Sequence, residues 1–302
     1  MVVTRAELTR EIIEPWVAVA HSSRLSADIL SQIGEPLKES NFDQINGLYP
    51  FERASDWCRE FLSAGIEHMQ LWADHVAPLR FHAEAEVIHT FRPVQTLSRA
   101  SVESAAHAVW VMDGNTALEC ARRHLCLVLD DLDQQGKATP DPERKKHLKE
   151  ARRTLLERLE SVIKESEIGR FPGYMNMVKQ AAATVATKGK ADSDLRDPAV
   201  VERLWRASAG SAHGKRWPSL ELQLVTPGQE IAPGTFETSR IPDPAAITKI
   251  LNLANEVLTY GVFRFADYSG YTPQLSTIMA SAQQRLAERI PRRNDEHNVS
   301  QE

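Results

Sequence analysis

Proline spacing is the feature that most constrains how this chain folds. The 302-residue sequence contains 16 prolines, and the long stretches between them carry apolar residues every three or four positions. That spacing places apolar side chains on one side of a helix, while proline starts, kinks or ends helices because it lacks a backbone N–H. The sequence therefore predicts an all-α protein, a helical bundle. The expected helices span residues 4–33 (with Thr4 as a cap), 51–77, 93–112, 117–132, 141 onward, 198–217, 247–265 and 272–290.

One segment departs from helical spacing and predicts a small inserted β-hairpin near residues 219–240. Three leucines alternate there with polar residues, as in a half-buried strand, at Leu220, Leu222 and Leu224. Gly228 and Gly234 flank the expected turn, which leads into a second short strand around Phe236.

Two further stretches lack any large apolar periodicity. Residues 181–197 are small and polar, which predicts a frayed helix end followed by a mobile loop. The stretch from Pro291 is typical of a disordered tail. We therefore expect an N-terminal helical region over 1–92 that packs on a helical core over 93–270. A last helix and the tail occupy 271–302.

Composition and charge narrow the classes of protein. The chain is 42% hydrophobic and 25% charged, as in ordinary soluble globular proteins, and its net charge is -5. This balance disfavours a globally basic nucleic-acid binder but is compatible with a local basic patch. Three scattered cysteines are too few for a disulfide framework, which indicates reduced thiols and a cytoplasmic location. The charged N-terminal residues and the lack of an apolar run of about 20 residues predict neither a signal peptide nor a membrane span.

Common nucleotide-binding and hydrolase motifs are absent. The sequence has no G-x-G-x-x-G, and residues 210–216 (GSAHGKR) have one residue too few between their glycines for a phosphate loop. The same stretch does not spell G-x-S-x-G, the motif of a hydrolase nucleophile. No cysteine pairs have the spacing of a zinc site. We therefore expect no cofactor.

A seven-residue repeat of histidines raises the question of a metal site, at His68, His75, His82 and His89. Seven helical residues span about 10 Å, so successive members of the repeat are too far apart to share one ion. Glu86 and His89 form one E-x-x-H pair, whereas di-iron bundles use two such pairs. We therefore interpret the histidines as the edge of an apolar stripe and predict no metal site.

Residues 143–153 (ERKKHLKEARR) hold six basic residues against two acidic ones. Two interpretations stay open for this run. It either contacts phosphates or forms a solvated helix face with ion pairs such as Glu150 with Arg153.

The most informative pattern is a polar stripe on the helix expected over 93–112. Arg99, Glu103 and His107 recur every four residues, so all three lie within about 80° of one helical face. The rest of that helix is built for a core.

A second pair of polar residues lies on the helix expected over 198–217. Arg206 and His213 are seven positions apart, which places them about 20° apart around the axis. Ala209 and Gly210 lie between them and are small enough to let another helix or a ligand approach, leaving a shallow polar notch. The alternative is tight helix packing in which Arg206 and His213 pair with acids such as Glu103.

These residues resemble a known motif. Arg206 and His213 spell R-x6-H, which resembles the R-x(4 to 6)-H motif of the HEPN superfamily of helical bundles. The wider pattern is similar to HEPN-like bacterial proteins in which an R-x3-E helix precedes a late helix ending in Ser-x(3 or 4)-His-Gly. Here those elements are Arg99, Glu103 and the stretch from Ser208 to His213 and Gly214. The similarity covers residues 93–265, and Ala207 stands where active members commonly carry a polar residue.

The resemblance implies a metal-independent ribonuclease site. His213 would take the proton from a ribose 2′-hydroxyl, and Arg206 would stabilise the charge on the phosphate. Glu103 would orient either group, and the products would be a 2′,3′-cyclic phosphate and a free 5′-hydroxyl. The expected binding residues are Arg99, His107, Ser208 and Ser211.

Two functions stay open on this basis. The first is an RNA-cutting enzyme of a toxin or phage-defence type. Active members of the superfamily pair across the motif-bearing helix, so the resemblance also predicts that this chain is a homodimer. The second is a non-catalytic helical interaction or scaffold protein, as other members are. We predict that Arg99, Glu103, Arg206 and His213 converge in space, because each pair lies on one face of its own helix and the small residues between Arg206 and His213 let the helices close.

Overall fold

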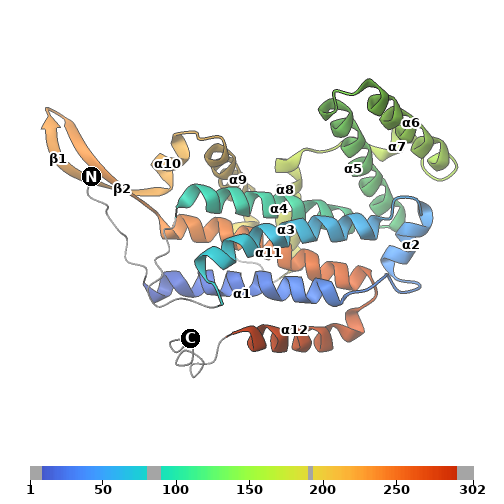
Figure 1. The fold of residues 1–302 in the computed structure, drawn as a ribbon, viewed down its shortest axis with the longest axis horizontal. Helices are drawn as coiled ribbons and strands as arrows, with labels where there is room; N and C mark the ends of the chain where they lie inside the picture. The colour runs from blue at the N-terminus through green and yellow to red at the C-terminus, as the bar shows by residue number, and fades with distance from the viewer. Residues whose placement is uncertain (1–8, 80–89, 190–192, 291–302) are drawn as a thin grey trace, which may run out of the picture.

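The computed structural model describes residues 9–79, 90–189 and 193–290. Within that part the chain is 75% helical and has twelve α-helices and one two-stranded antiparallel hairpin (Figure 1), so the prediction of a mainly helical fold with a hairpin is confirmed. The helices are α1 (Arg10–Gln32), α2 (Asn41–Leu48), α3 (Ala54–Val76), α4 (Phe91–Met112), α5 (Ala117–Ala138), α6 (Pro142–Leu159), α7 (Glu165–Ile168), α8 (Tyr174–Lys188), α9 (Pro198–Ala212), α10 (Trp217–Glu221), α11 (Pro244–Tyr268) and α12 (Leu275–Arg289). The hairpin consists of β1 (Gln223–Ala232) and β2 (Thr235–Pro242), and short 3₁₀ turns lie at Ser193–Arg196 and Thr272–Gln274.

Three helices begin with the same dipeptide, Asp-Pro. Proline fixes the first helical residue in the right conformation, and the preceding aspartate caps the helix by accepting a backbone N–H bond. The bonds measure 3.0 Å from Glu143 to Asp141, 2.8 Å from Ala199 to Asp197 and 2.9 Å from Ala245 to Asp243. The dipeptide therefore fixes where α6, α9 and α11 start.

The core is organised around α4, which packs against α3, α11, α9 and α8. Figure 1 shows α1, α3, α4 and α11 lying along the long axis, with α12 against α1, α5 to α7 projecting at one end and the hairpin at the other. One continuous cluster of buried apolar residues runs from Trp16 on α1 to Ala282 on α12. The helices of residues 1–92 therefore share their core with α4 and α11. The proposed division at 92 and 270 stays a prediction.

Several helix boundaries differ from the prediction. Thr4 lies outside the described residues, and α1 begins at Arg10 and continues through Pro15. Helix α2 was not predicted, and α5 extends to Ala138 rather than ending at residue 132. The polar end of α5 contains Gln134, Gln135, Lys137 and Ala138, which are good helix formers, and it is helical without a buried face of its own.

The prediction of a frayed end over residues 181–197 is wrong for its first half. Helix α8 continues to Lys188, and Ala181, Ala182 and Val185 are buried. Small side chains bury little area each, but they let α8 approach α4 closely. A search for large apolar residues at helical spacing does not detect such a buried face.

The hairpin region also differs in detail. Helix α9 ends at Ala212 rather than at residue 217, and Leu220 belongs to α10, so the strand begins after Leu222. Gly228 lies within β1, and the turn is formed at Gly234. The expected half-buried strand is wrong, because almost the whole of β1 is exposed.

The C-terminal tail and the membrane span are the last features that the sequence analysis addressed. The tail predicted from Pro291 lies outside the described residues. None of the helices in the described ranges combines the length and the apolar character needed to cross a bilayer.

Candidate functional site

The predicted stripe on α4 is a set of interlocked polar contacts with α9. The Arg99 side chain donates to Glu103 at 2.8 Å, and both groups are largely buried. The indole N–H of Trp205, on α9, donates to the same carboxylate oxygen at 2.6 Å. The Arg99 guanidinium also lies over the Trp205 ring, 5.1 Å from its centre. Glu103 is therefore held by two donors of its own chain.

His107, the third member of the stripe, lies among aromatic rings. Its ring stacks on Phe61 at 4.7 Å and on Phe171 at 6.0 Å, and the edge of Tyr174 meets it at 5.6 Å. Its Nδ1 lies 2.6 Å from the Glu103 carbonyl oxygen, which only accepts, so Nδ1 carries the proton. Burial lowers the pKa of His107, against the opposing effect of that hydrogen bond, so the ring is neutral at pH 7.

The aromatic rings around the stripe form a surface that the sequence did not reveal. We define the aromatic surface as Phe61, His107, Phe171, Tyr174 and Trp205. Tyr174 is 47% exposed, and the other four side chains are partly buried. They come from α3, α4, α8, α9 and the segment before α8. The one local signal is the F-P-G-Y sequence at 171–174, which places two aromatic residues around a Pro-Gly turn.

Arg206 lies on the opposite, solvent side of α9. Its side chain is 56% exposed and donates to Glu202, one turn earlier on the same helix, at 2.8 Å. Lys179 of α8 donates to the same carboxylate at 2.8 Å. Hydrogen bonds from Lys179 and then Arg206 lower the pKa of Glu202. The arginine of the motif is therefore part of a surface ion-pair network.

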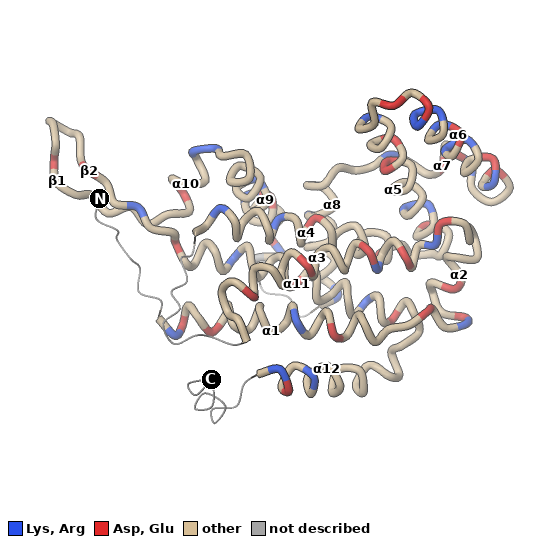
Figure 2. The backbone as a smooth tube through the Cα atoms, in the orientation of Figure 1, with Lys and Arg blue, Asp and Glu red and all other residues tan. Residues whose placement is uncertain are grey.

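His213 is the residue at which α9 ends. Gly214 follows with a positive φ of 68°, and the Lys215 N–H bonds back to the Gly210 carbonyl at 2.8 Å, a usual way to close a helix. His213, Lys215 and Arg216 are all exposed in this turn, where Figure 2 shows basic residues between α9 and α10. The His213 side chain makes no hydrogen bond to any described residue.

The two predicted serines are buried and used by the fold. Ser208 donates to the Leu204 carbonyl at 2.9 Å, and Ser211 donates to the Gln95 side chain on α4. A larger residue at Gly210 would clash within the same chain, because a Cβ there would lie 2.8 Å from the Pro218 side chain. The space beside Gly210 is thus filled by α10 of the same chain rather than by a ligand.

The four residues expected to converge fall into two groups. Arg99 and Glu103 contact each other and Trp205, while Arg206 and His213 face solvent on α9. Within the described ranges, neither Arg206 nor His213 makes a hydrogen bond or ion pair with Glu103. Trp205 therefore takes the place beside Glu103 that Arg206 was expected to occupy.

The histidine repeat lies only partly within the described residues. His68 and His75 lie on α3, whereas His82, Glu86 and His89 fall outside the described residues. Among described residues, no three His, Cys, Asp or Glu side chains are grouped as a metal site.

The basic run at 143–153 forms an exposed part of α6. There Arg152 pairs with Glu165 at 2.6 Å and Arg153 pairs with Glu150 at 2.6 Å. These pairs favour the interpretation as a solvated helix face.

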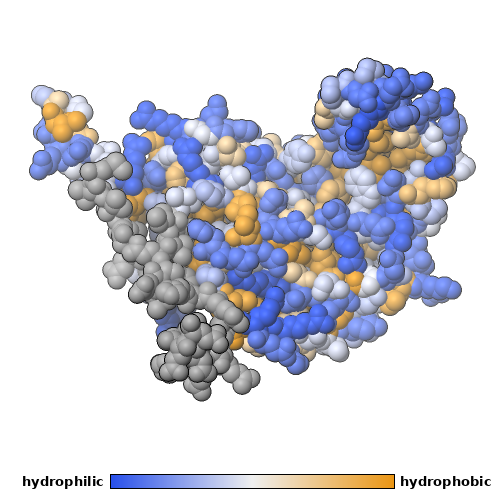
Figure 3. All heavy atoms as spheres, in the orientation of Figure 1, coloured by the Kyte–Doolittle hydropathy of each residue, from blue (hydrophilic) through white to orange (hydrophobic). Residues whose placement is uncertain are grey.

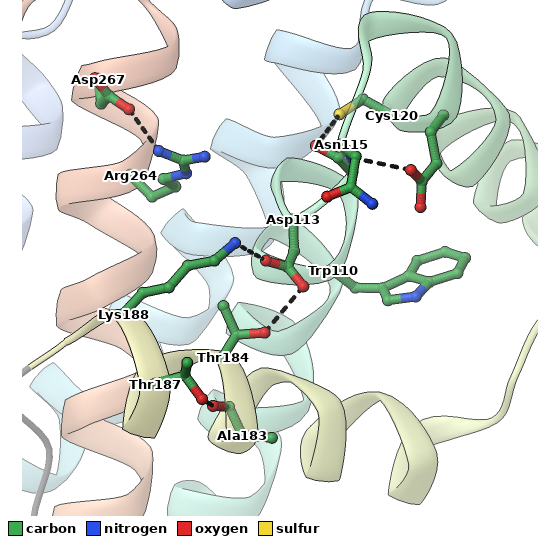
Figure 4. Close-up of polar contacts among 12 residues, drawn as sticks. Trp110, Asp113, Asn115, Cys120, Ala183, Thr184, Thr187, Lys188, Arg264 and Asp267 are labelled. Atoms are coloured by element: carbon green, nitrogen blue, oxygen red, sulfur yellow. Dashed lines mark hydrogen bonds and ion pairs between the residues drawn. The ribbon is translucent and has the colours of Figure 1, made fainter.

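A second polar cluster closes the far end of α4. Lys188 and Thr184 of α8 donate to the Asp113 carboxylate at 2.5 and 3.0 Å (Figure 4). Arg264 pairs with Asp267 nearby on α11 at 2.7 Å. The two bonds to Asp113 tie the end of α8 to the end of α4 and support the helical conformation of α8 up to Lys188.

Comparison with known proteins does not assign the chain to a family. No protein-family model, curated protein or solved structure matches it.

Proposed function

We propose that this chain is a HEPN-like helical bundle that acts by binding a protein partner rather than by cutting RNA. The observation that supports this most is the state of the two charged residues expected to catalyse. Glu103 is held by Arg99 and Trp205, and Arg206 is held by Glu202. Neither is poised toward His213, so the acid, base and phosphate-binding roles are not assembled.

The aromatic surface supports the binding role. Aromatic rings and arginine are enriched at the centres of protein interfaces, where they bury large areas at little entropic cost. Tyr174, Phe61 and Trp205 present such rings beside the Arg99–Glu103 pair. A partner that covers this surface would meet rigid side chains that are already oriented by their contacts.

One observation favours the ribonuclease as a second candidate. Arg206 and His213 both lie on the exposed side of α9, with Lys215 and Arg216 beside His213. In that function two copies would face each other across α9, so that each phosphate would meet two arginines and two histidines. His213 would be the general base and Arg206 would neutralise the phosphate.

Incubation with total RNA in EDTA separates the two functions. We expect intact RNA at high protein concentration, since the catalytic groups are not assembled. Three samples are compared: the unaltered chain, His213→Ala, and the control His147→Ala, which changes an exposed histidine on α6. Cleavage by the unaltered chain and by His147→Ala, but not by His213→Ala, would overturn the binding proposal and establish the ribonuclease.

A further inference from the structure

The hairpin of β1 and β2 projects from the helical body with little support. Figure 1 shows it extending beyond α10, and most of its residues are exposed. A two-stranded hairpin alone in water is marginally stable, and a third strand or a packed face is normally required. Ile231 is 67% exposed and Phe236 50% exposed, and Figure 3 shows hydrophobic residues on this arm. The arm therefore has both the instability and the apolar side chains of an interaction element.

The two open edges of the hairpin are not equivalent. In the part of the chain that the structure describes, the sheet has only these two strands, so one edge of each strand is paired with no described strand. Strand β1 contains Pro227, and its register is irregular on either side of Glu230. A proline on an outer strand removes a donor from the open edge. Strand β2 has no proline between Thr235 and Ile241, so its edge is the one fit for pairing.

We propose that β2 pairs antiparallel with β2 of a second copy, so that two hairpins form one four-stranded sheet. A contact between identical strands is isologous, and its two-fold axis is perpendicular to the sheet. That axis keeps each side chain on its own face. Residues opposite each other must then be separated by an even number of positions, which leaves few registers.

Attraction between an arginine and an aromatic ring favours one register among them. With the axis at Thr238, Phe236 lies opposite the partner's Arg240, and Glu237 lies opposite the partner's Ser239. An arginine over an aromatic ring is attractive, and it occurs twice by symmetry.

The neighbouring registers are worse for definite reasons. An axis at Glu237 places two carboxylates opposite each other, and an axis at Arg240 does the same with two guanidinium groups. An axis at Ser239 brings Pro242, which has no N–H, opposite the partner's Phe236.

The selected register also extends the pairing already present within each hairpin. Glu230 is opposite Phe236, and Val225 is opposite Arg240. Across four strands one row becomes Glu230, Phe236, the partner's Arg240 and the partner's Val225. Oppositely charged groups thus flank an aromatic ring in this row, and the exposed apolar residues gain neighbours.

Cysteine cross-linking tests the register. In Thr238→Cys the two new cysteines of the dimer lie directly opposite each other. The Cβ atoms of opposite residues are close enough that a small shift of the strands allows a disulfide to form. Thr226→Cys, on β1, is the matched control because it lies on the far strand, opposite Ser239. The native cysteines are buried, and burial raises the pKa of Cys126 to about 11, so they contribute little background.

Under mild oxidation we expect the full-length Thr238→Cys chain to become a covalent dimer and Thr226→Cys to stay uncrosslinked. Equal cross-linking of the two variants would contradict the register. Light scattering that gave the mass of one chain for the unaltered protein at micromolar concentration would overturn the proposal.

A swap of the paired residues provides an independent test. Phe236→Arg places two guanidinium groups opposite each other and should give monomers. The double variant Phe236→Arg with Arg240→Phe restores an arginine opposite a phenylalanine and should restore the dimer. Failure of the double variant to regain the dimer mass, while its circular dichroism shows a folded helical protein, would contradict the proposed pairing. The result is independent of α9 and of RNA cleavage, so it stands apart from the proposed function.

Discussion

His124 gives the most direct test of how the core responds to pH. This residue lies on α5 and is almost fully buried, with its ring against Trp57. Its Nε2 donates to the Glu52 carbonyl oxygen at 2.8 Å, so Nε2 carries the proton of the neutral ring. The other nitrogen, Nδ1, is buried and has no partner among the described residues. Protonation of Nδ1 would therefore place a charge where nothing in the described core accepts it.

Burial lowers the pKa of His124 from 6.5 to about 4, and the hydrogen bond to Glu52 only partly opposes it. The unfolded chain binds the proton near pH 6.5 and the folded chain does not. Stability is therefore full above pH 6.5 and is lost as the pH falls toward 4. Each tenfold difference in proton affinity is worth about 1.4 kcal/mol, so this one histidine accounts for a loss of about 3 kcal/mol between pH 7 and pH 4.

The variant His124→Gln isolates this contribution. The glutamine amide nitrogen is able to donate to the Glu52 carbonyl as Nε2 does, but it does not titrate. Urea unfolding at pH 7 and pH 4 should show that the unaltered chain loses about 3 kcal/mol more than the variant. Other groups, such as the carboxylates in ion pairs, titrate in both proteins and cancel in the difference. Equal losses in the two proteins would refute the reasoning that burial keeps His124 neutral.

Two further changes test the packing and the α4 stripe. Gly114→Ala brings a Cβ within 2.9 Å of the Cys120 backbone nitrogen and should lower the free energy of unfolding by about 1 to 3 kcal/mol. Gly136→Ala has nothing within 4 Å of its new Cβ and should raise the free energy of unfolding by up to about 1 kcal/mol. Thermal unfolding of both variants checks this pair, and equal melting temperatures would contradict it. Trp205→Phe removes the N–H that bonds Glu103 and should cost about 1 to 2 kcal/mol in urea unfolding, while Trp217→Phe, whose indole donates to no described residue, should be nearly neutral. A larger loss for Trp217→Phe than for Trp205→Phe would contradict the role assigned to Trp205.

The parts of the fold that follow from local chemistry could be predicted from the sequence. Large apolar residues at helical spacing located α3 and α4, and Pro142 and Pro198 marked helix starts because their aspartate caps precede them. The parts that failed depend on contacts far along the chain. The second half of α8 consists mostly of small residues, so its place in the core depends on its contact with α4 and on the bond from Thr184 to Asp113. No pattern of large apolar residues marks these contacts in the sequence.

The hairpin failed for a related reason. Leu220 and Leu222 alternate as strand residues do, but Trp217 and Pro218 start a short helix that packs beside Gly210. Proline at the first turn of a helix outweighs alternation over so few residues. The strands gain little burial from the described body of the chain, because almost all of β1 and more than half of β2 is exposed. The alternation of apolar and polar residues therefore does not mark a half-buried strand here.

The rotation of α9 about its own axis decides which residues of the candidate site come together. The R-x6-H spacing fixes how Arg206 and His213 lie relative to each other, but it does not fix which side of α9 meets α4. Buried positions decide that side. Val201, Ser208 and Ser211 are buried at intervals of seven and three residues, which defines an inner face. Trp205 borders that face and reaches Glu103, and Arg206, turned about 100° further, points to solvent. The motif residues therefore meet a substrate or partner only from outside the fold, whereas the α4 stripe serves to hold α9 in place.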